Sequence, residues 1–255
     1  MIRHGEQSER DGRPGVVLLH SGVADHRMWE PQVASLASSY RVLAPDLRGF
    51  GQHPHQPGPF SHAEDVLELL DQVGLEEAAL VGSSFGGRVA LETAATAPHR
   101  VSALVLVCTA FRGLPPTPDV EAFGEAEDRL LEEGDVSGAV ELNVRTWLGP
   151  EAPPAARELV REMQGRSFEL DRAAEALSPP PEPQGTDVDP ARLTMPALVV
   201  RGGRDLLWFR QIAEHLAGEL PSAELVTLDW AAHLPSLERP AEVSQLLEDF
   251  LARTL

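Results

Sequence analysis

The stretch AALVGSSFGG, residues 78–87, decides how this chain folds. An apolar run of strand character leads into a glycine–serine turn, and a helical pattern follows directly at residues 88–92. A strand, a sharp turn and a helix in this order are the context that a nucleophile elbow requires. Glycines two positions before and after Ser84 leave room for a turn that larger side chains would block. The motif therefore predicts a nucleophilic Ser84; a plain helix start, with Ser83 or Ser84 as N-cap, is the alternative that the motif alone leaves open.

The same alternation of strands and helices continues on both sides of this stretch. Apolar runs predict strands at residues 16–20, 41–45, 78–82, 101–108, 197–200 and 223–228. Helical periodicity predicts helices at residues 28–38, 62–73, 85–97, 209–220 and 241–252. Continuously apolar strands that are separated by helices form a parallel sheet covered on both faces. The sequence therefore predicts an α/β fold with a mostly parallel central sheet flanked by helices.

The alternation stops after the fourth of these strands. From residue 112 to residue 192 the chain has no strong strand candidate and ends in the proline-rich stretch 178–190. Its helical patterns fall at residues 120–133, 136–147, 155–165 and 169–177. We therefore predict a core formed by residues 1–111 and 193–255, interrupted by a mostly helical cap, residues 112–192. An insertion at the carboxyl end of a parallel sheet lies over the place where such sheets bind ligands.

The composition argues against several classes of function. The chain has 255 residues, enough for this core and cap, and its net charge of −19 argues against nucleic acid or an anionic membrane as a partner. The absence of lysine excludes a Schiff-base mechanism. Cys108 is the only cysteine and lies in an apolar run, so we expect a buried thiol and no disulfide within the chain. No signal-peptide core or membrane-spanning run is evident, so we expect a cytoplasmic protein, and the abundance of Ala, Gly and Pro is typical of a GC-rich bacterial genome.

A nucleophilic serine needs a base and an acid that orients the base. In this architecture they should follow the last two strands, in the order Ser, Asp, His. Asp205 follows the strand predicted at residues 197–200, and His233 follows the strand predicted at residues 223–228. Taken singly, Asp205 is also typical of a helix N-cap, and His233 of a loop histidine. Their arrival together in the required order favours a triad of Ser84, His233 and Asp205.

With these motifs in place, the chain resembles the α/β-hydrolase family over essentially its whole length. The matching segments are VVLLHSG at 16–22, DLRGFG at 46–51, GSSFGG at 82–87, GRD at 203–205 and HLPSLERP at 233–240. The last segment is more like serine esterases and enol-lactonases than other members. The resemblance implies an eight-stranded, mostly parallel sheet. We expect it to be shortened at its N-terminal edge, since the few residues before the first strand would form one hairpin at most.

The resemblance also implies acyl-transfer chemistry with an oxyanion hole. One donor is the backbone N–H of Phe85, the residue after the nucleophile. The second comes from the loop after the first strand, where counting along the chain places Gly22, with Val23 as the neighbouring alternative. Ser21 stands where the family usually has glycine, a departure that a backbone donor tolerates.

Large apolar side chains near these motifs are candidates for the substrate pocket. We expect it to be lined by Val23, Phe111, Trp147 and Leu234. The cap also carries Phe123, Met163 and Phe168, which would either line the pocket or form a small core of the cap. Arg145 and Arg166 would either bind a substrate carboxylate or pair with surface glutamates. His53 and His55 lie in a proline-rich loop without further ligands at suitable spacing, so we expect no metal and no cofactor.

These features predict a serine hydrolase that cleaves an ester, lactone or thioester of a small organic acid through an acyl-enzyme on Ser84. A small-molecule substrate and water are its expected reactants. The alternatives are an acyltransferase or cyclase of the same fold, a carbon–carbon bond hydrolase, and a non-catalytic small-ligand-binding protein. Carbon–carbon hydrolases of the family often carry an aromatic residue after the histidine, where this chain has Leu234. The sequence indicates no oligomeric state.

Overall fold

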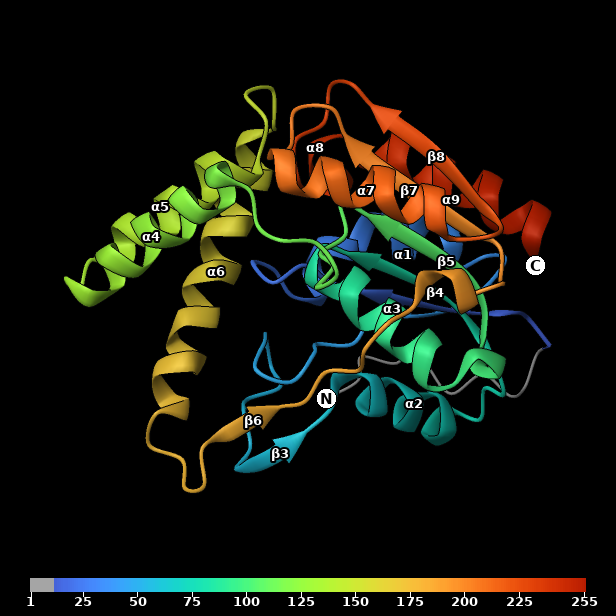
Figure 1. Cartoon of the computed structure of the whole chain (residues 1–255), viewed down its shortest axis with the longest axis horizontal. Coiled ribbons are helices and arrows are strands. Elements are labelled where there is room, and N and C mark those ends of the chain that lie inside the picture. Colours follow the sequence, from blue (N-terminus) through green and yellow to red (C-terminus); the bar gives the residue numbers. More distant parts are fainter. Residues whose placement is uncertain (1–11) are drawn as a thin grey trace.

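The centre of the molecule is a six-stranded sheet, seen in a computed structural model that describes residues 12–255 (Figure 1). Its strands, in spatial order, are β2 (Arg41–Leu43), β1 (Gly15–Leu19), β4 (Ala78–Ser83), β5 (Val101–Val107), β7 (Ala197–Gly202) and β8 (Ala223–Leu228). Every pairing between neighbours is parallel. The predicted α/β fold is therefore confirmed, and all six predicted strands are present.

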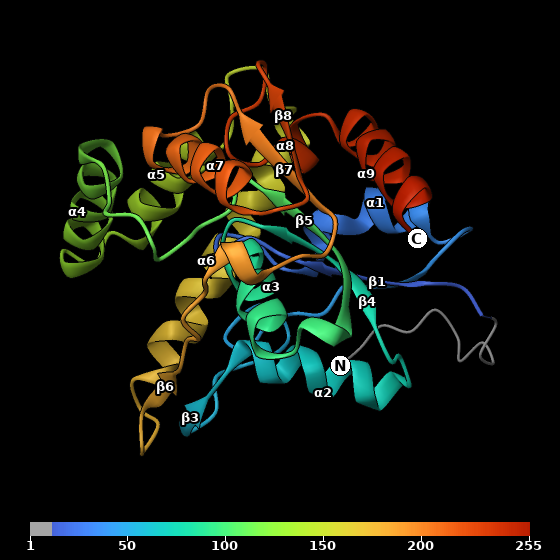
Figure 2. The same ribbon diagram turned by 45° about the vertical axis from the view of Figure 1, so that its right-hand side comes forward.

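Helices cover both faces of the sheet because successive strand residues point to opposite sides. Val16 and Leu18 belong to the apolar cluster that also holds residues of α1 (Glu30–Leu36) and α9 (Pro240–Thr254). The opposite cluster holds Val17 and Leu19. It also takes in residues of α2 (His62–Val73), α3 (Phe85–Thr96) and α7 (Leu207–Glu219). Figure 2 shows α1 beside α9 on one side of the sheet and α2 and α3 on the other.

Several short elements connect these layers. They are the 3-10 helices η1 (His26–Trp29), η2 (Pro98–Arg100) and η3 (Pro190–Arg192) and the one-turn helix α8 (Pro235–Glu238). A separate parallel pair joins β3 (Gly58–Phe60) to β6 (Pro181–Pro183) at the edge of the molecule. This pair is not predicted from the sequence, since both strands are three residues long and contain proline.

The segment between β5 and β7 forms three helices beside the core: α4 (Pro118–Glu132), α5 (Val136–Trp147) and α6 (Pro154–Ala174) (Figure 1). The prediction of two helices at residues 155–165 and 169–177 is wrong, because α6 runs unbroken through Gly165. Glycine costs a helix about 1 kcal/mol relative to alanine. Here the buried stripe of Val160, Met163, Ser167 and Leu170 continues past it, and packing offsets that cost.

The cap helices share the core of the sheet. Val144, Val160 and Met163 belong to the same apolar cluster as Val16 and Leu18 of β1. The expectation of a separate small core in the cap is therefore wrong. The exact boundaries of the cap, residues 112–192, stay a prediction.

Two further expectations concern the number of strands in the main sheet and the absence of membrane-spanning segments. Residues 12–255 contain a six-stranded main sheet, where the resemblance implied eight strands. The N-terminal hairpin would fall on residues 1–11, outside the described part. Among the described residues, no helix is both long and apolar enough to span a membrane.

Candidate active site

Ser84 stands at the end of β4 in a strained backbone conformation. Its φ of 50° and ψ of −113° lie in a region that non-glycine residues rarely adopt. Three backbone hydrogen bonds hold it there: its N–H donates to the Val107 carbonyl at 2.9 Å, and its carbonyl accepts the N–H groups of Arg88 and Ala110, each at 3.1 Å. The Ser84 side chain makes no capping hydrogen bond to α3. Ser84 thus occupies the N-cap position of α3 without capping the helix through its hydroxyl, which stays free for another role.

The glycines of this turn are required by close contacts with neighbouring backbone and side-chain atoms. A Cβ on Gly82 would lie 2.3 Å from the Gly86 carbonyl oxygen, and one on Gly86 would lie 2.2 Å from that of Leu19. A Cβ on Gly87 would lie 2.3 Å from Thr109 Oγ1. The motif therefore allows α3 to start directly against β1 and β4, with Ser84 at the carboxyl edge of the sheet.

His233 and Asp205 form a buried hydrogen-bonded pair at the same edge. The His233 Nδ1 to Asp205 Oδ2 distance is 2.8 Å, and both side chains are 2% exposed. Asp205 follows β7 and His233 follows β8, so both stand at carboxyl ends of parallel strands, as Ser84 does. Because Asp205 is an acceptor, Nδ1 of His233 carries a proton, and Nε2 is the basic nitrogen of the neutral ring. The second carboxylate oxygen, Asp205 Oδ1, accepts the Leu206 N–H at 2.7 Å.

Two aromatic rings enclose the His233 imidazole. Its ring centroid lies 4.6 Å from that of Trp147 at the end of α5 and 4.1 Å from that of Phe209 in α7. The His233 backbone N–H donates to the Trp147 carbonyl at 3.2 Å, and Trp147 Nε1 donates to Asn143 Oδ1 at 2.7 Å. The cap thus contacts the candidate base directly, through both the backbone and the side chain of Trp147.

The two candidate oxyanion donors lie side by side. A Cβ on Gly22 would be 3.5 Å from the Cβ of Phe85, which places the loop after β1 against the start of α3. The fully buried His20 fixes this loop: its Nε2 accepts the Leu47 N–H at 2.9 Å, and its Nδ1 donates to the Ser21 carbonyl at 2.9 Å. Burial lowers the pKa of His20, which favours the neutral ring, and the two hydrogen bonds select this tautomer. His20 belongs to a motif of the sequence, but its spacing from the other motifs did not indicate that its side chain would hold the loop after β1.

The four expected pocket residues are not all brought together. Trp147 lies on His233, and Val23 is partly buried beside Gly22. Leu234 has no exposed surface and packs within the core cluster. Phe111 joins the opposite cluster, with its ring 5.7 Å from that of His215 in α7. Phe123 packs on Trp147 at 4.5 Å between ring centroids.

Sequence reasoning missed one further residue near the base, Glu238 in α8. This buried carboxylate accepts the Ala232 N–H at 3.0 Å through Oε1 and the Gly149 N–H at 3.2 Å through Oε2. Ala232 precedes His233, and Gly149 follows the cap segment that contacts it. Burial raises the pKa of Glu238, and the charge of nearby Asp205 adds to this. Glu238 thus joins the histidine loop to the cap.

We expect Glu238→Gln to lower the free energy of unfolding by about 1–3 kcal/mol, because an amide NH₂ would then face one of two buried N–H donors. Urea denaturation measures this change. The matched control is Glu242→Gln in α9, where the side chain is 54% exposed and pairs with Arg239. That control should stay within about 0.5 kcal/mol of the unmodified protein. Equal stability of Glu238→Gln and the unmodified protein would contradict the proposed link.

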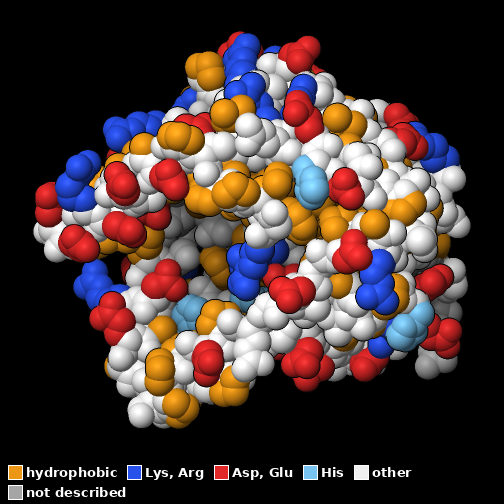
Figure 3. Space-filling model, viewed as in Figure 1, with side chains coloured by type: hydrophobic (Ala, Val, Ile, Leu, Met, Phe, Trp, Pro, Cys, Tyr) orange, Lys and Arg blue, Asp and Glu red, His pale blue; other side chains and the backbone are white. Residues whose placement is uncertain are grey.

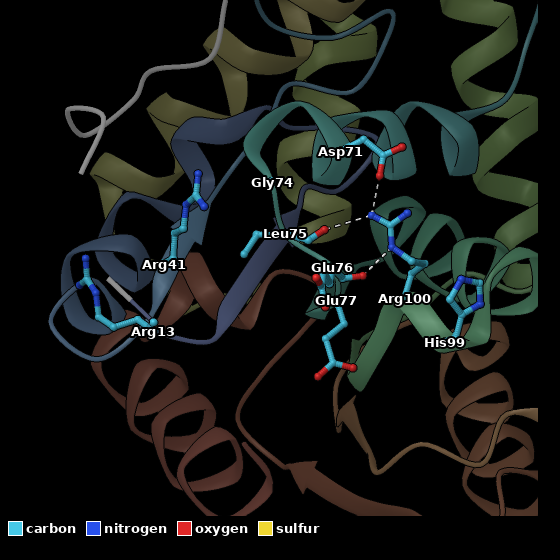
Figure 4. Close-up of a pocket in the computed structure, with 10 residues that line it drawn as sticks. Arg13, Arg41, Asp71, Gly74, Leu75, Glu76, Glu77, His99 and Arg100 are labelled. Carbon is cyan, nitrogen blue, oxygen red and sulfur yellow. Dashed lines mark hydrogen bonds and ion pairs between the residues drawn. The ribbon is translucent and has the colours of Figure 1, made fainter. Parts of the chain in front are cut away.

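A wide hollow lies at the opposite edge of the sheet. It measures about 1010 Å³ and is lined by residues that precede or begin strands, among them Arg13, Arg41, Glu77 and Arg100 (Figure 4). Arg100 is held there by Asp71 at 2.7 Å and by the Leu75 carbonyl at 3.0 Å. Since parallel sheets place their active sites at the carboxyl ends of the strands, this hollow is not the catalytic site.

Comparison with known proteins agrees with this fold. A family model described as alpha/beta hydrolase fold matches residues 14–240. The chain is 31% identical over 269 residues to the dihydrolipoyllysine-residue acetyltransferase component of the acetoin cleaving system of Pseudomonas putida, with 99% of this chain and 67% of the relative covered. It is 30% identical to the 2-hydroxymuconate semialdehyde hydrolase of Pseudomonas putida, with 95% and 88% covered. Among solved structures, the enol-lactonase from Burkholderia xenovorans LB400 superposes with a TM-score of 0.77 at 27% identity, with 96% of this chain and 94% of that chain covered.

Proposed function

The chain belongs to the α/β-hydrolase fold family and is a hydrolase, and on this premise we propose that it cleaves an ester, lactone or thioester of a small organic acid through an acyl-enzyme on Ser84. One observation carries the proposal: the buried 2.8 Å hydrogen bond between His233 and Asp205, at the sheet edge where Ser84 follows β4. A solvated loop histidine has no reason to be paired and enclosed in this way.

In the proposed reaction, Ser84 Oγ attacks the carbonyl carbon of the substrate while His233 Nε2 takes the hydroxyl proton. Asp205 holds the imidazole in the required tautomer and stabilises the imidazolium that forms. The N–H groups of Phe85 and Gly22 bind the oxyanion of the tetrahedral intermediate. His233 then gives its proton to the leaving group, which departs and leaves the acyl-enzyme.

Water completes the cycle by the same steps. His233 Nε2 removes a proton from a water molecule, which attacks the acyl carbon, and the second tetrahedral intermediate collapses to release the acid and Ser84 Oγ–H. In an acyltransferase, a different acceptor would take the place of water at this step. The acetyltransferase component among the relatives makes this the second candidate function.

Covalent labelling combined with an ester series tests the proposal. A fluorophosphonate probe should label the protein, and peptide mapping should place the label on Ser84. 4-Nitrophenyl esters from acetate to octanoate then report hydrolysis and the length of the acyl chain accepted. Labelling with hydrolysis supports the hydrolase; labelling without hydrolysis of any ester favours transfer to another acceptor. An unlabelled protein would contradict a nucleophilic Ser84.

A further inference from the structure

Arg88 lies one helical turn after Ser84, on the same side of α3. Its backbone N–H donates to the Ser84 carbonyl at 3.1 Å. Its guanidinium carbon lies 4.7 Å from the centroid of the Phe85 ring, so a cation–π contact holds the charge over the residue that follows the nucleophile. A positive charge therefore stands over the side chain of the residue that follows the nucleophile.

This guanidinium is poorly satisfied within the described residues. Arg88 Nε is buried and has no hydrogen-bond partner there. The nearest carboxylate oxygen, Glu92 Oε1, is 3.7 Å away, too far for a hydrogen bond, and it lacks a partner as well. Burial lowers the pKa of Arg88 and the positive charge of Arg112 lowers it further, while the charge of Glu92 only partly opposes them. Bringing two arginines together without a hydrogen-bonded anion is unfavourable, and an anionic ligand would remove that cost.

Space for such a ligand adjoins the two arginines. Arg88 and Arg112 line one cavity of about 240 Å³ between α3, the loop after β5 and residues 186–188. Glu92 and the exposed Asp187 are its acidic members. The volume suits a short acidic arm rather than a whole drug-sized molecule. On the face of the molecule drawn in Figure 3, arginine and histidine side chains border a hollow.

The cap arginines that the sequence suggested for this role are placed differently. Arg145 is exposed on α5. Arg166 forms an exposed pair with Glu169 at 3.1 Å and donates to the Gly51 carbonyl at 3.3 Å. Of the arginines considered, Arg88 is the one held over the ring of the residue after the nucleophile, with a buried donor that has no partner among the described residues.

We propose that Arg88, assisted by Arg112, binds a carboxylate carried by the substrate, so that the preferred substrates are half-esters or lactones of short dicarboxylic acids. The inference rests on the proposed function for the identity of the reacting bond. One turn of helix rises about 5.4 Å, so a spacer of a few methylene groups separates the reacting carbonyl from the carboxylate. An arginine binds a carboxylate through two parallel hydrogen bonds, which selects for a planar anion.

A matched pair of esters tests the preference. Mono-(4-nitrophenyl) glutarate carries a free carboxylate, and methyl 4-nitrophenyl glutarate has the same chain with the charge removed. The unmodified protein should favour the anionic ester at least 10-fold in kcat/KM, mainly through KM, as expected for one charge-assisted contact. Arg88→Gln should reduce the ratio to about 1, while Arg88→Lys, which keeps the charge, should retain part of it. Arg145→Gln is the control and should leave the ratio unchanged. A ratio that Arg88→Gln does not alter would overturn the inference.

A binding measurement separates this inference from the proposed function. Calorimetry should detect binding of monomethyl glutarate to the Ser84→Ala protein. The affinity should be about 10- to 100-fold weaker in Ser84→Ala/Arg88→Gln. Dimethyl glutarate, which carries no charge, should not bind to either protein. Binding that depends on Arg88 in a protein that hydrolyses no ester would reject the hydrolase and retain the site. If the protein hydrolyses esters but neither prefers the anionic ester nor binds monomethyl glutarate, the hydrolase is retained and the carboxylate site at Arg88 is rejected. Melting temperatures of each variant show whether a loss reflects unfolding.

Discussion

Ser84→Ala is expected to lower kcat for ester hydrolysis by about a million-fold, to the residual rate that binding and the oxyanion donors alone support. The reason is that the proposed reaction has no other nucleophile: Cys108 is fully buried, and burial raises the pKa of its thiol well above the usual value. Removing the Ser84 hydroxyl therefore removes the acyl-enzyme, and His233 and Asp205 are left with nothing to activate but water. Initial rates with 4-nitrophenyl acetate, at high enzyme concentration, measure the difference.

Ser83→Ala is the matched control for this experiment. Ser83 adjoins Ser84 in the same motif, but it is fully buried, and its Oγ has no hydrogen-bond partner among the described residues. We expect the Ser83→Ala protein to keep a rate of ester hydrolysis within about 10-fold of the unmodified protein. Because the Ser83 hydroxyl has no partner among the described residues, its removal leaves no other polar group without a hydrogen bond. If Ser84→Ala retained the activity of Ser83→Ala, the acyl-enzyme mechanism would be wrong for this protein.

Much of the fold follows from local patterns that the chain repeats. The predicted bounds of α2, α5 and β8 match the structure, because each element has an uninterrupted pattern and a clear end. α2, for example, begins after an N-cap, Ser61, and ends at Gly74 in the left-handed conformation. The prediction failed where tertiary packing overrides a local signal, as at Gly165 inside α6, and where strands are too short to have a period, as in β3 and β6.

The sequence was sufficient to propose which residues form the candidate site, but not to predict the side chains that surround them. Ser84, Asp205 and His233 could be placed because each follows a recognisable strand, and parallel strands bring such positions to one edge. The rings around His233 come from α5 and α7, and the contact of Glu238 with Gly149 joins segments 89 residues apart. Such contacts depend on how the cap docks on the core, which no periodicity encodes. Phe111 shows the same limit: its distance from the elbow along the chain did not indicate that it packs on the other face of the sheet.

Gly86→Ala is expected to lower the free energy of unfolding by at least about 3 kcal/mol, enough to leave little folded protein. The added Cβ would lie 2.2 Å from the Leu19 carbonyl oxygen and 2.6 Å from that of His20. Both obstacles are backbone atoms at the end of β1, an interior strand that pairs with β2 and β4 and is therefore unable to move aside alone. Any shift that admitted the methyl group would also displace the loop bearing Gly22. We therefore expect the fraction that folds to lose ester hydrolysis as well.

Gly124→Ala separates this steric effect from the general consequence of replacing a glycine. Gly124 lies inside α4, and a Cβ there meets nothing within 4 Å. Because alanine is the better helix former, this control should raise the free energy of unfolding by up to about 1 kcal/mol. The midpoints of thermal and urea denaturation should therefore be lower in Gly86→Ala and higher in Gly124→Ala than in the unmodified protein. A Gly86→Ala protein as stable as Gly124→Ala would mean that α3 does not approach β1 as closely as the elbow geometry requires, and the placement of Ser84 would have to be revised with it.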